Sequence, residues 1–257
     1  GKVLVIDNAS PAKLPPPHHD ALAVVTITND TNLGYAAAMN QTVALTTAPY
    51  LLSLNADCTL ESGYVAACVA ELEDNNTAAA VTGVLRLPDG RIDSSGIAFS
   101  ADGRAVDRDR HADTPSTGEP FGVSGAAALW RRTALESLGA APWWSWLFVY
   151  WDDVEIAFRL RARGWTFRCA ANASASHRRG SDSADPDFVE GQALRNRIAT
   201  LSRHLGLRGL SRPRTAAQLL ATVARLAVRH PKALRRAEPL RAARVGLAER
   251  RADSFAV

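Results

Sequence analysis

Short apolar runs alternate with longer amphipathic segments in the first third of the chain. Each run is short enough for a strand and is bounded by polar or turn-forming residues, whereas the segments between the runs have helical spacing. The predicted strands are residues 3–6, 21–30, 49–57 and 78–87, and the predicted helices are residues 32–48 and 61–75. This alternation predicts an α/β fold, with a mostly parallel sheet flanked by helices.

The pattern changes after residue 87. Two turn signals, PDG and ADG, flank short strand-like pieces and predict a hairpin excursion. The expected elements are the hairpin at 87–110, a loop at 111–120, a strand or loop and then a helix ending at Gly139, a helix within 150–165, a loop at 171–188, and helices from 189 with a break at 211–213. Three consecutive prolines exclude an ordinary helix from residues 11–20.

Composition fits a globular protein whose basic charge is concentrated at one end. Of the 257 residues, 47% are hydrophobic and 22% charged, and the net charge is +4. Eleven of the Lys and Arg residues but only three acids lie in residues 211–257. With no apolar stretch of membrane-spanning length, no secretory signal and three cysteines without metal-ligand spacing, we expect a cytoplasmic protein with reduced thiols. The start at Gly1 and Lys2, without Met, suggests a processed, engineered or truncated chain.

Polar residues follow the predicted strands, where ligands collect in open α/β sheets. They are Asp7, Asn8, Asn29, Asp30, Asn55 and Asp57. The Asp57 carboxylate could hold a divalent cation over a diphosphate, or it could cap the following turn. The sequence contains neither G-x-G-x-x-G nor a P-loop, which removes the main support for a dinucleotide-binding Rossmann domain.

Two adjacent carboxylates, Asp152 and Asp153, open a predicted helix directly behind the apolar run LFVYW. The helix dipole favours acids in a first turn, which accounts for one of them as a cap. Two acids in apolar surroundings suggest a task, because burying a carboxylate is costly. The helix N-terminus would help to keep a catalytic base ionised, and the aromatic side chains before the pair suggest a pocket wall.

Other candidates have equally simple structural explanations. His177 lies among small residues and is either solvated or, if the fold brings it near Asp57, functional. The small-residue segments NLGYAAAMN and GVSGAAAL allow either close approach of a ligand or tight packing of a helix.

Taken together, these motifs resemble family-two inverting glycosyltransferases with a GT-A (Rossmann-like) fold, and in particular rhamnosyltransferase-like members. The matching pieces, in the family's order over about residues 2–200, are VLVIDNAS, TNLGYAAAMN, YLLSLNADCTL, LRLPDGR, GVSGAAALWRRTALESLG, YWDDVEIAFRLRARGW and the His of SASHRRGS.

The resemblance implies a role for each matching residue. The residues expected to bind the donor are Asp7, Asn32, Gly34, Asn55, Asp57, Ser124 and Gly125. Asp57 and His177 would hold a divalent metal, Mg²⁺ or Mn²⁺, Asp153 would be the catalytic base, and Asp152 replaces the usual Glu before it. Arg195 and Asn196 resemble an Arg-Asn pair that is common after the core.

The resemblance also reveals departures. The family normally begins one strand and one helix earlier, so we expect the sheet to lack a central strand. Trp143, Trp144 and Ser145 replace a Phe-Asp-Glu triplet. The leading hypothesis is therefore a metal-dependent inverting glycosyltransferase that uses a nucleotide sugar, with dTDP-rhamnose as candidate donor, to extend a cell-surface glycan or lipid-linked acceptor. The alternative is a truncated or degenerate relative that binds without catalysing.

The basic end predicts a helical extension, residues 201–257, after a catalytic domain of residues 1–200. One helix face carries Leu219, Leu220, Val223 and Leu226. Such a basic amphipathic helix suits an anionic membrane surface on the inner face, and it equally suits packing against the catalytic domain. Nucleic acid is not an expected partner, because the basic residues are not interleaved with aromatics.

Overall fold

The computed structural model describes residues 1–11, 20–179 and 185–255. The proline run at 15–17 and residues 180–184 of the expected loop lie outside this part of the chain. The strands are β1(Lys2–Asp7), β2(Ala23–Thr28), β3(Tyr50–Leu54), β4(Cys58–Leu60), β5(Ala78–Arg86), β6(Ile92–Ser94), β7(Ile97–Phe99), β8(Ala105–Asp107), β9(Ala127–Arg131) and β10(Thr166–His177). The helices are α1(Tyr35–Ala44), α2(Tyr64–Asp74), α3(Arg132–Glu136), the 3₁₀ turn η1(Ser145–Leu147), α4(Asp152–Arg161), α5(Pro186–Leu210), α6(Pro213–Arg229), α7(Pro231–Ala237) and α8(Pro239–Phe255).

The central sheet is mixed. Its strand order is β3-β9-β5-β10-β4, with β6 paired to β5. Only the β5–β10 pair is parallel among the ladders of this sheet in the described residues, whereas β3–β9, β5–β9, β4–β10 and β5–β6 are antiparallel. The α/β fold is therefore confirmed, but the expectation of a mostly parallel sheet is wrong. Strand β6 returns along β5 through the tight PDG turn, and such a short return permits only antiparallel pairing.

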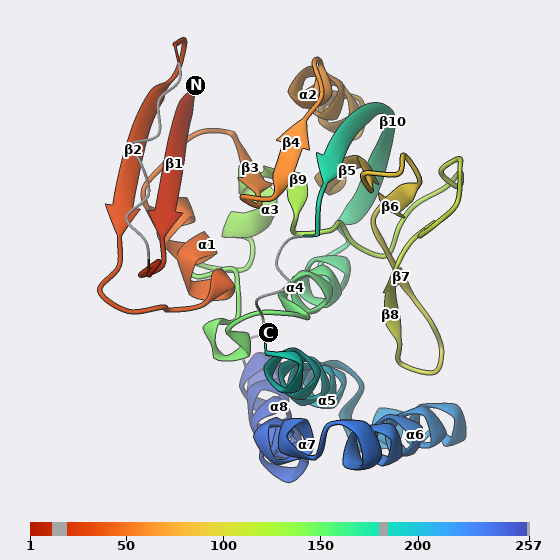
Figure 1. The fold of residues 1–257 in the computed structure, drawn as a ribbon. Coiled ribbons are helices and arrows are strands. Elements are labelled where there is room, and N and C mark those ends of the chain that lie inside the picture. The colour runs from red at the N-terminus through yellow and green to blue at the C-terminus, as the bar shows by residue number, and fades with distance from the viewer. Residues whose placement is uncertain (12–19, 180–184, 256–257) are drawn as a thin grey trace.

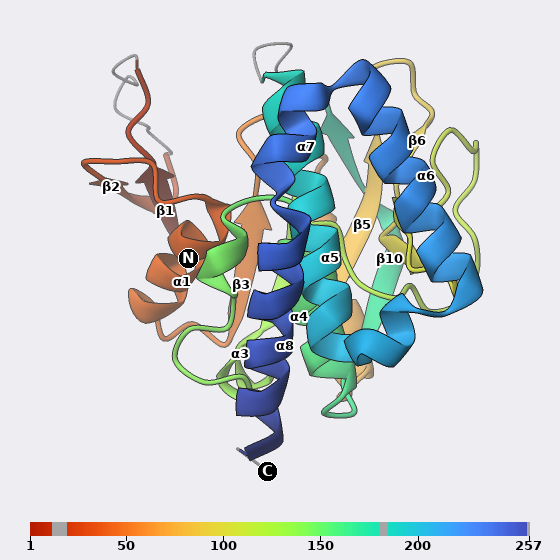
Figure 2. The same cartoon turned by 90° about the horizontal axis from the view of Figure 1, so that it is seen from below.

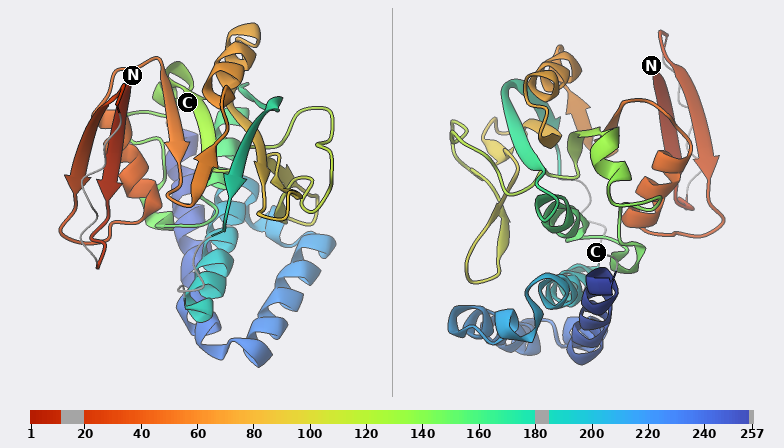
Figure 3. Two further views of the ribbon diagram at one scale, coloured as in Figure 1. Left: turned by 45° about the horizontal axis from the view of Figure 1, so that its top comes forward. Right: turned by 180° about the vertical axis from the view of Figure 1, so that it is seen from behind.

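Strands β1 and β2 form a separate parallel pair, beside β3 in Figure 1 and visible again in Figure 3. No ladder joins this pair to the central sheet among the described strands. The expectation that the sheet lacks a central strand stays a prediction.

Strand β10 corrects one sequence-based expectation, because residues 171–177 continue the strand that begins at Thr166 and are not a loop. The strand pairs with β5 along one edge and with β4 along the other. Its buried alanines, Ala170, Ala173 and Ala175, pack in the cluster that lies under α2. Small residues, which suggested a loop, here allow the helix to pack closely on the sheet.

Other local predictions are confirmed. Strands β7 and β8 pair as a hairpin around the ADG turn, where Gly103 has φ 75°. Helices α1, α2 and α4 lie where helical spacing predicted them, whereas α3 ends at Glu136, before the Gly139 turn. The chain breaks between α5 and α6 at residues 211–212. No described helix is long and apolar enough to cross a membrane.

The C-terminal helices form a layer below α4, which lies between them and the sheet (Figures 1 and 2). Leu219, Val223 and Leu226 of α6 pack into a cluster with α5, while Leu220 is 69% exposed. Most of the apolar face predicted from the sequence thus points inward. Helix α5 runs through residue 200, where we expected the domain boundary, and the division into two domains stays a prediction.

A buried carboxylate joins α4 to this layer. Glu155 is fully buried and accepts from the Arg159 Nε and Nη2 atoms at 3.0 and 2.7 Å. Arg203 Nη1 and His204 Nε2 of α5 lie 3.0 and 3.2 Å from Glu155 Oε1, and Arg203 also pairs with Asp253 of α8. Burial alone would raise the pKa of Glu155, but these cationic neighbours outweigh it and lower the pKa to about 2.

Replacing this carboxylate should cost much of the stability of the protein. Glu155→Gln leaves Arg159 and Arg203 without their charge partner, so we expect the free energy of unfolding in urea at neutral pH to fall by about 3–5 kcal/mol. Because the folded pKa lies below the ordinary value of 4.5, the contribution is complete above that value and is lost as pH falls toward about 2. The difference between wild type and variant should therefore shrink over that range.

The exposed Glu136, whose side chain is 56% accessible and pairs with Arg132 on α3, provides the matched control. Glu136→Gln should change the free energy of unfolding by less than about 1 kcal/mol. Equal losses for the two variants would contradict the role given to Glu155.

Candidate functional site

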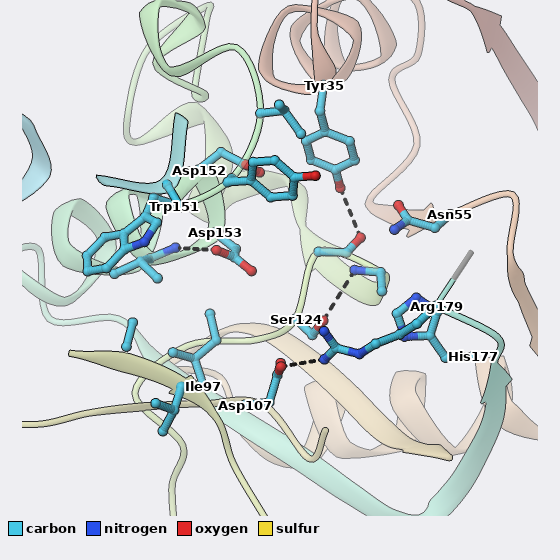
Figure 4. Close-up of a pocket in the computed structure, with 18 residues that line it drawn as sticks. Tyr35, Asn55, Ile97, Asp107, Ser124, Trp151, Asp152, Asp153, His177 and Arg179 are labelled. Atoms are coloured by element: carbon cyan, nitrogen blue, oxygen red, sulfur yellow. Dashed lines mark hydrogen bonds and ion pairs between the residues drawn. The ribbon is translucent and has the colours of Figure 1, made fainter. Parts of the chain in front are cut away.

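A cavity of ≈ 390 Å³ opens between the ends of the central strands, the β7–β8 hairpin and the start of α4 (Figure 4). Its polar lining residues are Tyr35, Asn55, Asp107, Ser124, Tyr150, Trp151, Asp152, Asp153, His177 and Arg179. They come from segments far apart in the chain. Five predicted donor-site or catalytic positions (Asn55, Ser124, Gly125, Asp152 and Asp153) and the predicted metal ligand His177 thus share one cavity.

An unusual turn presents the acidic pair. Phe148, Tyr150 and Trp151 all have φ between 65° and 68°, in the left-handed region that non-glycine residues rarely adopt. The Asn196 amide on α5 holds this turn, because its Nδ2 lies 2.8 Å from the carbonyl oxygens of Leu147, Val149 and Tyr150. Asn196 therefore positions the turn and does not line the cavity.

The neighbouring Arg195 supports the same segment. Its guanidinium lies 3.6 Å from the centre of the Trp146 ring and donates to the Trp146 carbonyl at 3.0 Å. The aromatic wall predicted before the acidic pair is only partly correct. Tyr150 and Trp151 line the cavity, whereas Phe148 is not among its lining residues and its ring packs against Phe188.

The two acids differ in their surroundings. Asp152 is buried, and burial followed by the charge of Asp153 raises its pKa well above the ordinary value. Burial, and then the nearby Asp107, raises the pKa of Asp153 to about 6. The Val154 N–H donates to Asp153 Oδ1 at 2.8 Å, but this contact does not outweigh burial. A carboxylate with such a pKa is suited to accept a proton near neutral pH.

A potential metal site lies at the other side of the cavity. The ligand atoms of Asp57, Cys58 and His177 all lie within 4.8 Å of one another, and His177 Nε2 is 3.5 Å from Asp57 Oδ2. Antiparallel pairing of β10 with β4 places His177 opposite Cys58 and so brings it to Asp57. The fold therefore brings His177 near Asp57, which is the condition for a functional role of this histidine.

Asp93 of β6 fixes the orientation of the His177 ring. This fully buried carboxylate lies 2.7 Å from Nδ1, which leaves Nε2 facing Asp57. The same hydrogen bond is the main reason that the pKa of His177 is raised to about 10, so a metal ion has to displace a proton from it. A carboxylate behind a ligating histidine is the usual support of such a ligand. The donor set therefore fits a divalent cation that keeps open positions for phosphate oxygens.

Sequence reasoning missed four residues of this region. The spacing of the cysteines indicates no metal site, yet Cys58 follows Asp57 directly and its thiol is one of the potential metal ligands. Asp93, Asp107 and Arg179 were not singled out. Arg179 Nε lies 2.5 Å from Asp93 Oδ1, and its Nη2 pairs with Asp107. For Asp93, the sequence signal is an acidic residue between Ile92 and Ser94 in a strand-like segment.

Besides Asp57 of the potential metal site, three predicted donor residues lie outside the cavity lining. Asp7 accepts from the Ser10 N–H at 2.9 Å, which is the main reason that its pKa is lowered. Asn32 Oδ1 accepts from the Gly34 N–H at 2.9 Å. A Cβ on Gly34, which has φ 84°, would come within 2.7 Å of Phe148, so tight packing accounts for this glycine. These residues border the separate β1–β2 sheet, and their role in donor binding stays a prediction.

Comparison with protein families matches residues 2–139, just over half of the chain, to "Glycosyl transferase family 2". The chain belongs to this glycosyltransferase family. None of the curated protein sequences compared with it gives a significant match.

Solved structures share the fold of this family-2 chain. A structure of GalNAc-T7 with UDP, GalNAc and Mn²⁺ aligns with TM-score 0.58 and 14% identity over 79% of this chain and 41% of its own. The mannosyltransferase PcManGT from Pyrobaculum calidifontis, with GDP-Man and Mn²⁺, aligns with TM-score 0.54 and 17% identity over 97% of this chain and 74% of its own.

A third structure, S. aureus TarS 1–349 with UDP-GlcNAc, gives TM-score 0.51 and 10% identity over 98% of this chain and 83% of its own. At these identities the likeness concerns the fold, and it confirms the predicted GT-A class with its C-terminal helices. The family-2 chain spans less than half the length of GalNAc-T7.

Because Asp93 orients His177, we expect the affinity of this family-2 protein for Mn²⁺ to depend on Asp93. Asp93→Asn should weaken Mn²⁺ binding by about 10- to 100-fold, as loss of the support behind a ligating histidine commonly does. Electron paramagnetic resonance of free Mn²⁺ in a titration of the full chain measures this. Asp89→Asn, in the exposed turn before β6, is the control and should bind as wild type does. Unchanged affinity of Asp93→Asn would contradict the proposed support.

Proposed function

We propose that this family-2 protein is a metal-dependent inverting glycosyltransferase that moves a sugar from a nucleotide-diphosphate donor to an acceptor hydroxyl. One observation carries the proposal. A potential metal ligand, His177, and a carboxylate suited to act as base, Asp153, open into the same cavity. The metal-bound nucleotide complexes of proteins with this fold support the donor class.

Asp57 and His177 would hold the cation, with Asn55 and Cys58 beside them. When bound, Mg²⁺ or Mn²⁺ neutralises negative charge on the departing diphosphate. Arg179 lines the cavity next to His177, and we assign it to the same diphosphate, since a guanidinium binds phosphate oxygens in a forked geometry. Asp107, its present partner, would then exchange with the ligand. Asp7, Asn32, Gly34, Ser124 and Gly125 complete the proposed donor site.

Asp153 takes the proton of the acceptor hydroxyl as the oxygen bonds to the anomeric carbon. The bond from that carbon to the diphosphate breaks, and its electron pair stays on the diphosphate oxygen. A single displacement inverts the anomeric centre. Adjacent Asp152 and Asp153 cannot stand on opposite faces of a sugar as the carboxylates of hydrolases do. Burial raises the pKa of Asp152 well above its ordinary value. We assign Asp152 to orienting the acceptor.

We further propose dTDP-rhamnose as the candidate donor and a cell-surface glycan or lipid-linked molecule as the acceptor, on the sequence resemblance described above. An anionic membrane surface as partner of α6 receives less support. Three of its four predicted apolar contacts pack inward, although Leu220 and Val228 remain exposed.

Removing the base should separate catalysis from donor binding. Asp153→Asn preserves shape but cannot accept the proton, so the transfer rate should fall by about 10²- to 10⁴-fold. Calorimetry with UDP, GDP and dTDP in the presence of Mn²⁺ should give unchanged affinities. Asp113→Asn, at an exposed position outside the cavity lining, is the control. Transfer at the normal rate by Asp153→Asn would refute the assignment, and metal-dependent nucleotide binding would count against a protein that has lost its donor site.

The activity should depend on pH through the same group. Because the pKa of Asp153 is about 6, the base is protonated and inactive below this pH and ionised above it. We therefore expect kcat/KM to rise about tenfold for each pH unit below this pKa and to level off above it. A stopped assay over a range of buffers at constant ionic strength measures the profile. A profile that is flat through pH 6 would exclude Asp153 as the titrating base.

A further inference from the structure

A second cavity, of ≈ 230 Å³, adjoins the first. It is lined by Arg104, Ala105, Val106, Trp151, Glu190, Ala193, Leu194, Arg197, Thr222 and Arg225. Ala105, Val106, Trp151 and Ala193 line both cavities, so the two lie directly next to each other. We call the second one the arginine pocket. The β7–β8 hairpin, which reaches from the sheet toward α5 and α6 in Figure 1, forms one side of it.

Positive charge dominates the arginine pocket. Three arginines and one acid line it. Arg225 forms two contacts with Glu190, at 3.1 and 2.9 Å, and Arg104 pairs with Asp102 at 2.8 Å. Even when Asp102 is included, one positive charge remains uncompensated, and it belongs to Arg197.

Arg197 is 7% exposed and contacts only uncharged atoms among the interactions of the described residues. Its Nε donates to the Gly103 carbonyl at 3.0 Å, Nη1 to the Thr222 hydroxyl at 3.4 Å and Nη2 to the Asp102 carbonyl at 3.3 Å. A buried cation without an anionic partner is unfavourable. The pKa of Arg197 is lowered, first by this burial; the charge of Asp102 offsets only part of the effect, and that of Arg104 adds to it. An anion entering the pocket would supply the missing charge.

Trp151 connects this pocket to the proposed base. It stands two residues before Asp153 and lines both cavities, and Figure 4 shows both residues among those that surround the first cavity. A sugar against the indole ring would present a hydroxyl to Asp153 on one side and a substituent to the arginines on the other.

We propose that the arginine pocket binds an anionic group of the acceptor, a phosphate or a carboxylate, while the acceptor sugar lies against Trp151. This inference rests on the proposed function and names the acceptor class. The acceptor is then a negatively charged glycan or glycophosphate, and helices α5 and α6 select it through charge. Glu190 tunes the pocket because it competes for Arg225.

The test titrates the full chain with three probes after Mn²⁺ and a saturating nucleoside diphosphate have filled the donor side. The probes are glucose 6-phosphate, methyl glucuronide and neutral methyl glucoside, and calorimetry or NMR gives each Kd. We expect at least one charged probe to bind about tenfold more tightly than the neutral one, in line with one charge-assisted contact. The phosphate and carboxylate arms distinguish the two sources of charge.

Two variants that change the charge of the arginine pocket in opposite directions separate an effect on binding from structural damage. Arg225→Gln should weaken binding of the charged probe about tenfold, and Glu190→Gln should strengthen it, whereas general destabilisation cannot strengthen binding. Arg229→Gln, an exposed position on the same helix outside the pocket, should leave the Kd unchanged. Equal Kd values for charged and neutral probes, or no effect of either pocket variant, would overturn the proposal.

The nucleoside diphosphate titration distinguishes the two possible failures. If the nucleotide binds with Mn²⁺ while the charged probes show no preference, only the acceptor inference fails. If the nucleotide does not bind, the donor proposal fails, and repeating the probe titration without metal and nucleotide still tests the arginine pocket.

Discussion

The arrangement of the site depends on the charge of one buried side chain, Glu155. A carboxylate inside a protein is tolerated only with cationic partners, and here Arg159 comes from the same helix while Arg203 and His204 come from α5. Helix α4 can therefore be buried only when the C-terminal helices pack against it. Asp152 and Asp153 stand in the same first turn of α4 as Glu155, so the packing that neutralises Glu155 also determines where the acidic pair lies.

A second interaction between α5 and the acidic pair holds the turn before α4. Residues 148–151 include three non-glycine residues whose backbone φ is positive, which is unfavourable unless surrounding contacts enforce it. The Asn196 amide supplies these contacts through the carbonyls of the turn. Helix α5 thus restrains both sides of the acidic pair and contributes to the geometry of the site.

The two substrates would meet at this acidic pair from different layers. The proposed donor side consists of strand ends, where Asp93 and Arg179 complete the surroundings of His177. The proposed acceptor side consists of the β7–β8 hairpin, α5 and α6, with Trp151 lining both cavities. With this division, changes in the helical layer would alter the acceptor and leave the proposed metal and donor contacts in place.

Features that depend on neighbouring residues could be predicted from the amino-acid sequence. Turn signals predict the β7–β8 hairpin, helical spacing predicts α1, α2 and α4, and the motifs indicate both Asp57 and the acidic pair. Strand direction, the continuation of β10 to His177, the support from Asp93 and the inward orientation of Leu226 could not be predicted and become visible only in the folded chain. These features depend on strand register and on burial of charge between segments distant in the chain. Such pairings leave no periodic signal, because small residues such as those of β10 suit a loop and a closely packed strand equally well.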